Sequence, residues 1–345
     1  MRLDKYKTAI VCILVLLRGA ALVANPIEEA FPPLLDVAVA RGLDDLARQQ
    51  QADGSFTAFD EPGPRMLPAA QALLAFLSAG QVPAVGRHAL VVRNAVDFIV
   101  RQLPEDGEFG RADASGPFGQ AMITIALAEV YGLQTDAIQR LPIRDALDKA
   151  LKAILKSQDV RNDPMSGGWA IEGNGEGDLV ATLWMVLSLH SLRDAGLDVP
   201  REPMGRAAAF ARACRKRDPR GFSNRGAGPT PVSNAAGMAI LRLAERGGVE
   251  GLKPPATLPA ERSPEEAADL YGSIYAITLA AMLTDDPGWM ARWKSTRDLL
   301  LPKQMEDGSW FPTRAPQFGL GTVGATSTAV MTLAMPYRLL PLYGR

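Results

Sequence analysis

Two kinds of apolar segment alternate along the chain. In one kind, hydrophobic residues share a single helical face, as do Val92, Val96, Ile99 and Val100 within His88–Gln102. In the other kind, nearly every position is apolar. A helix with one apolar face borders solvent, whereas a helix that is apolar on nearly every side is surrounded by other helices. The alternation therefore predicts an all-α fold with an outer and an inner layer of helices.

The segments that are apolar on all sides are the predicted inner helices. They are Pro64–Ser78, Phe118–Tyr131, Asp178–Ala195, Ser233–Ala244, Tyr271–Leu283 and Thr326–Met335. The predicted outer helices are Leu34–Gln51, His88–Gln102, Ile143–Ser157, Met204–Cys214 and Trp289–Lys303. An inner ring of about six helices closes on itself, so that no helix face stays bare. We therefore predict an α/α toroid, in which about six helix pairs form two concentric rings.

A Gly-aromatic motif recurs after the outer helices. Its most complete copy is Gln304–Trp310, with the sequence QMEDGSW, and further copies end at Phe56, Phe109, Trp169 and Phe222. The copies lie about 50–60 residues apart, the scale of a helix pair with its loops. We interpret Tyr271–Leu283, in the longest interval, as the second helix of a unit that lost its motif.

Each part of the motif has a predicted structural role. Glycine accepts the left-handed backbone that ends a helix. The glutamine should hydrogen-bond exposed backbone groups there, and the aromatic residue should fill the gap between units. The residues with these roles are Gln51, Gly54 and Phe56; Gln102, Gly107 and Phe109; Gln158, Gly168 and Trp169; Gly221 and Phe222; and Gln304, Gly308 and Trp310.

These motifs carry a resemblance to a known family. Gln304–Trp310 resembles the Gln–Trp repeat of squalene and hopene cyclases. Ala126–Gly132, Gly167–Trp169 with Gly177-Asp178, and the ending Met335–Tyr343 are similar to the exported prenyltransferase/squalene-cyclase repeat proteins of planctomycete-type bacteria. The resemblance runs from Leu34 to the C-terminus. It implies the toroid, and it implies no assigned activity.

Acid chemistry of the cyclase type has one weak candidate. Cyclases of that kind protonate an alkene with an Asp-x-Asp-Asp cluster, and the corresponding segment Gly175–Thr182 keeps a single aspartate, Asp178. A lone carboxylate before an apolar helix is typical of an N-cap, whose oxygens accept backbone N–H groups. We therefore favour a capping role for Asp178 over catalysis.

The sequence offers few residues that could bind a metal ion. Prenyltransferases share the toroid and bind zinc through Asp, Cys and His, yet His88, His190 and Cys214 are the histidines and cysteine that follow the N-terminal segment. A zinc site needs three or more clustered ligands, so we expect no metal and no cofactor. We interpret Cys214 as a packing cysteine, with a reactive thiolate as the alternative.

Sugar chemistry remains an alternative, because toroids also host glycosidases and polysaccharide lyases. These enzymes need two carboxylates, or a His/Tyr base system, across a cleft. The candidates near predicted inner-helix starts are Glu172, Glu176, Asp178 and Asp269, with Tyr271 and Tyr275 close by. Acidic residues at helix starts are also common for dipole reasons alone.

Small and polar residues gather near the predicted starts of the inner helices. In a toroid these ends converge on one mouth of the central cavity, so the residues are candidates for ligand binding, although N-caps prefer the same residue types. They are Gln120, Thr124, Asp178, Thr182, Ser233, Asn234, Ser273, Tyr275, Thr326 and Thr328.

Charge and the N-terminus narrow the choice of function. The formal net charge is −1 and 47% of residues are hydrophobic, so nothing suggests nucleic-acid binding. Residues 1–24 combine a basic start, a short apolar run and small residues, which predicts a signal peptide, with an uncleaved anchor as the alternative. Residues 25–33 are a predicted linker and residues 34–345 a single toroid domain, periplasmic or extracellular.

The sequence thus favours an exported, non-catalytic binding or scaffold toroid in the cell envelope. Its expected partner is a hydrophobic small molecule, a peptide or another protein, and we expect no transmembrane span beyond an N-terminal anchor. The alternatives are a divergent terpenoid cyclase-like enzyme and a carbohydrate-active toroid.

Overall fold

The computed structural model describes residues 33–57, 65–83, 85–133, 137–171, 175–216, 221–245, 270–284, 287–311 and 321–343. The predicted signal peptide and nearly all of the predicted linker lie outside these residues and stay predictions. The chain divides into two compact units, Met1–Val37 and Ala38–Arg345. Of the first, residues 33–37 are described and begin helix α2 (Pro33–Gln49). The ring of helices belongs to the second unit.

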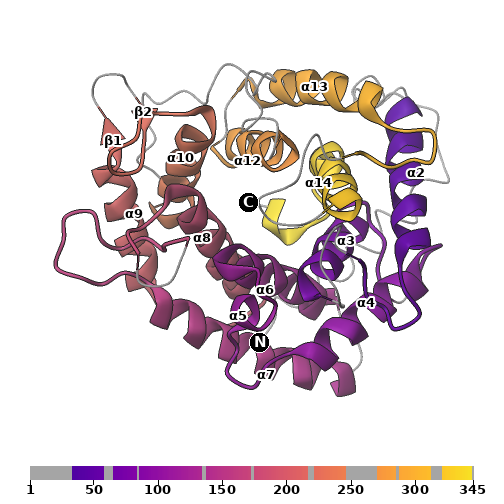
Figure 1. Ribbon diagram of the computed structural model, residues 1–345, viewed down its shortest axis with the longest axis horizontal. Helices are drawn as coiled ribbons and strands as arrows, with labels where there is room; N and C mark the ends of the chain where they lie inside the picture. The colour runs from indigo at the N-terminus through magenta and orange to yellow at the C-terminus, as the bar shows by residue number, and fades with distance from the viewer. Residues whose placement is uncertain are drawn as a thin grey trace, which may run out of the picture. The chain divides into compact units, whose positions relative to one another are not determined.

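Six helices of the described part form a closed inner ring (Figure 1). They are α3 (Met66–Ser78), α6 (Gly116–Leu133), α8 (Leu179–Asp194), α10 (Pro231–Glu245), α12 (Leu270–Leu283) and α14 (Gly321–Ala334). Each packs against the next along the chain, and α14 packs against α3. All residues of α3 are buried, as its apolar pattern requires. The predicted α/α toroid is confirmed.

Amphipathic helices lie outside this ring (Figure 1). Besides α2 they are α4 (Ala89–Gln102), α7 (Ala137–Ser157), α9 (Arg201–Ala213) and α13 (Trp289–Leu300). Helix α4 buries one face, which includes Val92, Val96 and Ile99. Helix α7 begins before the predicted Ile143 and contains Pro142, a residue at which the sequence pattern predicts a boundary. The stretch between α10 and α12 lies outside the described residues.

Short elements complete the described part. They are α5 (Phe109–Ala112), β1 (Arg215–Lys216), β2 (Gly221–Phe222), η2 (Leu301–Lys303), η3 (Met335–Tyr337) and η4 (Pro341–Tyr343). Strands β1 and β2 pair antiparallel, with Arg215 opposite Phe222 and Lys216 opposite Gly221. The C-terminal residues lie inside the ring, and η4 packs against α8 (Figure 1). Within the described segments, no helix combines the length and hydrophobicity of a membrane span.

The motif glycines bring neighbouring outer helices into backbone contact. Gly308 has φ +96°, and a Cβ there would lie 2.4 Å from the carbonyl oxygen of Arg41 on α2. Gly54 approaches Asn94 on α4 in the same way, with φ +90°. In the third copy the left-handed glycine is Gly167, with φ +101°, rather than the predicted Gly168. Only glycine combines this backbone conformation with such a close approach.

In two copies of the motif, the predicted glutamine fastens the loop to the next outer helix. Gln304 Nε2 donates to the carbonyl oxygens of Gly308 at 2.9 Å and Ala38 at 2.8 Å. Gln158 makes the equivalent pair of bonds, to Gly167 at 2.7 Å and Pro203 at 2.9 Å. In each case one side-chain amide bonds a carbonyl oxygen of its own loop and a carbonyl oxygen in the first turns of the next outer helix.

Two of the predicted glutamines differ from this pattern. Gln50, not Gln51, bonds the next outer helix, through the carbonyl oxygen of Val91 at 2.9 Å. Gln51 is exposed, because both residues follow the end of α2 and successive side chains of an extended segment point to opposite sides. Gln102 is also exposed, and Gln120 from the inner helix α6 bonds the motif glycine Gly107 instead, at 2.9 Å.

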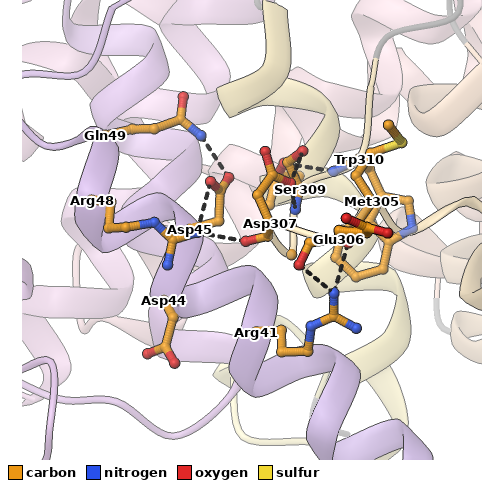
Figure 2. Close-up of polar contacts among 12 residues, drawn as sticks. Arg41, Asp44, Asp45, Arg48, Gln49, Met305, Glu306, Asp307, Ser309 and Trp310 are labelled. Atoms are coloured by element: carbon orange, nitrogen blue, oxygen red, sulfur yellow. Dashed lines mark hydrogen bonds and ion pairs between the residues drawn. The ribbon is translucent and has the colours of Figure 1, made fainter.

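Two arginines of α2 close the outer ring against the last motif (Figure 2). Arg41 donates to the carbonyl oxygens of Met305 and Glu306, each at 2.8 Å. Arg48 donates to the carbonyl oxygen of Asp307 at 2.5 Å. Hydrogen bonds from charged donors are stronger than neutral ones. Three consecutive carbonyl groups near the C-terminal end of the chain are thereby held by its first described helix.

The motif aromatics are all buried. Phe56, Phe109, Trp169, Phe222 and Trp310 are at most 1% exposed. Both tryptophans also bond the outer helix that precedes them in the chain. The indole N–H of Trp169 donates to the carbonyl oxygen of Ile154 at 2.9 Å, and that of Trp310 donates to the carbonyl oxygen of Leu300 at 2.8 Å. The two tryptophan motifs therefore bond both the helix before them and the helix after them.

Candidate functional site

Several polar residues predicted at the cavity mouth bind the backbone of the motifs. Thr182 Oγ1 accepts the N–H of Trp169 at 2.9 Å, and Thr326 Oγ1 accepts the N–H of Trp310 at 3.0 Å. Their equivalents in α10 and α6 make the same kind of contact. Those equivalents are Asn234, which accepts from Phe222, and Gln120, which accepts from Gly110. These side chains hold each inner helix to its motif.

The remaining mouth candidates lie in or beside the same helices. Ser233 Oγ donates to the carbonyl oxygen of Phe222 at 2.6 Å, and Thr124 Oγ1 donates within α6 at 2.7 Å. Thr328 is buried in α14, and Ser273 is half-buried in α12. The structure thus gives most of the predicted ring of polar residues a packing role.

Asp178 caps helix α8. Its Oδ1 accepts the N–H groups of Val180 and Ala181, each at 2.8 Å. Its Oδ2 accepts from the Asn224 side chain, whose own oxygen accepts the N–H of Leu179 at 2.9 Å. This is the N-cap geometry that the sequence favours.

A second carboxylate lies in the same loop. Glu176 is exposed and pairs with Arg225 at 3.2 Å. Because Asn224 and Arg225 are consecutive, one loop after β2 holds both Asp178 and Glu176. The other two predicted carboxylates, Glu172 and Asp269, lie outside the described residues.

An aromatic cluster spans the interior of the ring. Trp184 on α8 stacks on Tyr275 on α12, with ring centroids 5.9 Å apart and planes 4° apart. Phe118 meets Trp184 edge-on, at 5.3 Å and 82°. Helix α10 lies between α8 and α12 in ring order, so the stack joins helices that are not sequence neighbours in the ring. Sequence analysis named Tyr275 but missed Trp184 and Phe118.

A buried acid lies on α6. Glu129 is 2% exposed, and its Oε1 accepts from Ser191 Oγ at 3.3 Å. Burial raises the pKa of Glu129 to about 8, so its carboxyl group is mostly protonated at neutral pH. Sequence analysis missed this residue, although a single acid inside an apolar helix is a readable signal.

Two tyrosines lie close to this acid. The hydroxyl groups of Tyr275 and Tyr343 are 3.1 Å apart. Burial raises the pKa of both tyrosines, and the nearby charge of Glu129 raises them further. The interior of the ring therefore carries a polar cluster of Glu129, Ser191, Tyr275 and Tyr343.

Other buried titratable groups have structural partners. Asp113, from the loop before α6, caps α3 by accepting the N–H groups of Met66 and Leu67. Cys214 is buried, and this burial raises the pKa of its thiol to about 11. His88 Nε2 lies 3.0 Å from Asp44. Across the described segments, no three His, Cys, Asp or Glu side chains lie close enough to hold a metal ion.

Comparisons with solved structures relate this ring to glycosidases. The GH76A α-1,6-mannanase of Salegentibacter sp. HEL1_6 matches with a TM-score of 0.59 at 11% identity, over 88% of this chain and 99% of the mannanase. A glycosidase solved in complex with glucose matches with a TM-score of 0.58 at 14% identity, over 93% and 100%. An α-amylase from Clostridium perfringens matches with a TM-score of 0.52 at 10% identity, over 87% and 97%.

Sequence comparisons add no relative. No family model matches the chain, and no curated protein matches it. At 10–14% identity the structural matches establish the fold, which is an α/α toroid of the kind found in glycosidases.

Two expectations from the sequence are corrected by this result. The resemblance to squalene cyclases and prenyltransferases correctly implies a toroid, but the similar structures are glycosidases. The expectation of a protein without catalytic activity is contradicted, because those structures belong to catalytic hydrolases. The expectation of no catalysis rested on the absence of the cyclase acid motif and of a zinc site. Their absence argues against cyclase and zinc chemistry and says nothing about glycoside hydrolysis.

Proposed function

We propose that the protein is a carbohydrate-active enzyme that hydrolyses glycosidic bonds. The observation that carries this proposal is the extent of the fold match. The similar glycosidases are covered over 97–100% of their own length, so the likeness concerns the whole ring and not one helix pair. Most glycosidases act through a pair of carboxylic side chains, and the ring offers such residues in Asp178 and Glu176.

The mouth at the N-terminal ends of the inner helices is the proposed glycan site. The chain's own C-terminal segment occupies the other end, where Leu342 and Tyr343 are buried next to α8. Phe118 lies near the start of α6, and the Trp184 ring lies against it. Ligand sites combine aromatic surface with a few placed polar groups, and the C–H faces of a sugar ring pack well on aromatic side chains.

Asp178 and Glu176 are two of the described carboxylates at this end of the ring, where Asp113 caps α3. Hydrolysis of a glycosidic bond uses one carboxyl group as the proton donor and one carboxylate as base or nucleophile. Both oxygens of Asp178 accept hydrogen bonds from N–H donors, a geometry that suits the carboxylate of the pair. We assign that role to Asp178, in addition to its capping role.

A polysaccharide panel tests the proposal. The purified protein is incubated with α-1,6-mannan, starch and other glucans and mannans, and released oligosaccharides are identified by chromatography and mass spectrometry. We expect cleavage of at least one polymer. A protein that cleaves none of them, and binds none of the derived oligosaccharides by calorimetry, would refute the carbohydrate assignment.

The same purified protein, incubated with isoprenoids, tests the terpenoid cyclase alternative. We expect no cyclised product from squalene or shorter isoprenoids, because Asp178 stands without a second acid in its segment. Detection of such a product by gas chromatography would restore the terpenoid cyclase hypothesis. We further propose that the protein is exported, which would bring it to polymeric glycans outside the cytoplasm.

A further inference from the structure

The C-terminal segment Met335–Tyr343 fills one end of the ring. It leaves α14 through η3, turns at Arg338 and returns as η4 against α8. Arg338 has φ +50°, a conformation that costs free energy for a residue other than glycine. Its guanidinium group lies over the ring of Trp289, 5.4 Å from the centroid. The segment beyond it buries Leu340 and Leu342.

Two polar contacts join this segment to the inner ring. The backbone of Leu342 lies close to the Glu129 carboxyl group and acts to lower the pKa of Glu129, against the larger effect of burial. The Tyr343 hydroxyl group lies 3.1 Å from that of Tyr275. Glu129 Oε2 has no hydrogen-bond partner among the described residues. The acid is therefore incompletely bonded at the point where the segment covers it.

We propose that Met335–Tyr343 is a releasable closure of the ring, held in place while the Glu129 carboxyl group is neutral and loosened when it ionises. A neutral carboxyl group is stable at this site, because the Ser191 hydroxyl group that bonds it and the nearby Leu342 backbone are uncharged. An ionised carboxylate would be buried next to these same uncharged groups, and burying an unpaired charge is costly. Opening the segment would return that charge to water.

The groups that face Glu129 do not neutralise its charge. Asp194 on α8 adds negative charge, and it lies 3.0 Å from His190 on the same helix. Tyr275 on α12 and Tyr343 on η4 are neutral hydroxyl groups in this pH range. Helix α3, which packs against α6, carries no charged side chain.

Most cationic residues on the other helices packed against α6 contact their own neighbours. Helix α5 carries Arg111, and helix α7 carries Arg140, Arg144, Lys149, Lys152 and Lys156. Arg140 lies over the Tyr131 ring, Lys149 and Lys156 pair with Asp145 and Glu108, and Lys152 is exposed. Arg111 pairs with Asp106 and Glu108, and Arg144 pairs with Asp148.

Proton linkage gives the direction in which pH changes the opening of the segment, and the pH range over which it does so. With the segment closed the pKa of Glu129 is about 8, and with the carboxyl group in water it returns toward its usual 4.5. The closed state therefore binds more protons between these values, so its advantage is complete at acidic pH and is lost as the pH rises toward 8. The opening constant should rise by about tenfold per pH unit between about pH 5 and pH 8, and then level off.

Hydrogen exchange of the full chain measures this opening directly. Protection factors for a peptide that covers Leu340–Tyr343, corrected for the intrinsic exchange rate at each pH, are determined by mass spectrometry at pH 5.5, 6.5 and 7.5. We expect them to fall by several-fold to tenfold per pH unit, while a peptide from α3 keeps its protection. Equal protection of the C-terminal peptide at all three pH values would overturn the proposal.

Two variants assign the effect to Glu129. Glu129→Gln should remove the pH dependence, since glutamine keeps the acceptor and cannot ionise. Tyr343→Phe should lower protection at every pH and keep the slope, since it removes the tyrosine contact but not the acid. A slope that persists in Glu129→Gln would assign the titration elsewhere. If Glu129→Gln does not fold, the pH dependence of protection in the wild type and in Tyr343→Phe still tests the proposal. These readouts are independent of carbohydrate hydrolysis.

Discussion

The side-chain amide of Gln304 donates a hydrogen bond to the carbonyl oxygen of Ala38 at 2.8 Å, across nearly the whole described chain. This contact repeats what Gln50 does with Val91 and Gln158 with Pro203. The junction between the last and the first outer helices is thus built like the junctions inside the chain. A closed ring requires this equivalence, whereas an open array of repeats would end in a differently built cap.

Gln304→Ala should lower stability by about 1–3 kcal/mol, because the carbonyl groups of Ala38 and Gly308 each lose a hydrogen bond from this side chain. Urea unfolding measures the change. Gln51→Ala is the matched control, since Gln51 is exposed and bonds its own helix at Gln49. We expect the control to stay within about 0.5 kcal/mol of the wild type. Equal effects for both variants would contradict the closure of the ring through Gln304.

Gly308→Ala should destabilise the protein by more than about 1 kcal/mol. The added Cβ would meet the carbonyl oxygen of Arg41 at 2.4 Å, and the backbone at Gly308 is left-handed. Gly132→Ala is the control, because nothing lies within 4 Å of a Cβ built there and the residue is helical. Alanine at position 132 should be neutral or stabilising. Calorimetric melting temperatures compare the two, and a harmless Gly308→Ala would refute the close approach.

Trp310→Ala should cost about 3–5 kcal/mol, because it leaves a large cavity beside α2. Trp310→Phe should cost less, since it keeps most of the packing and loses the bond to the Leu300 carbonyl oxygen. Phe311→Ala is the control, because the Phe311 side chain is 56% exposed. A Trp310→Ala protein with wild-type stability and altered glycan binding would show that Trp310 is a binding residue.

The helical layers could be predicted from the sequence, because burial on all sides requires apolar residues on all sides. Which of two adjacent residues makes a given contact could not be predicted. Gln50 replaces Gln51, and Gly167 replaces Gly168, since helix ends and turns depend on local geometry that spacing does not fix. The contact of Trp184 with Tyr275 could not be predicted for another reason. It joins two helices across the ring, and the position of one helix along its axis relative to the other is set by packing.

The Cys214 thiol should be unreactive in the folded protein. Burial raises the pKa of this thiol to about 11, so the thiolate is scarce at pH 8. A chromogenic disulfide reagent added at pH 8 to the protein without residues 1–24, which include Cys12, should react slowly in buffer and quickly in urea. Because the folded-state pKa lies above the ordinary value of 9.0, the reaction should speed up as the pH rises toward 11. Rapid modification without unfolding would restore the reactive-thiolate alternative.

Asp178→Asn should cost about 1 kcal/mol through the weakened cap of α8. Its effect on catalysis should be much larger, a loss of at least about a hundredfold, if Asp178 is the carboxylate of the reaction. Asn224→Ala is the matched control, because it removes one bond to Asp178 and keeps the carboxylate. Thermal unfolding of both variants separates the structural cost from the chemical one.

The most direct test of the carbohydrate assignment is the rate at which new reducing ends appear in a polysaccharide incubated with the wild type, Asn224→Ala and Asp178→Asn. We expect release by the wild type, reduced release by Asn224→Ala and almost none by Asp178→Asn, at temperatures where all three are folded. No release by the folded wild type from any glucan or mannan would contradict the assignment. Full release by Asp178→Asn would keep the enzyme and move its catalytic carboxylate elsewhere in the ring.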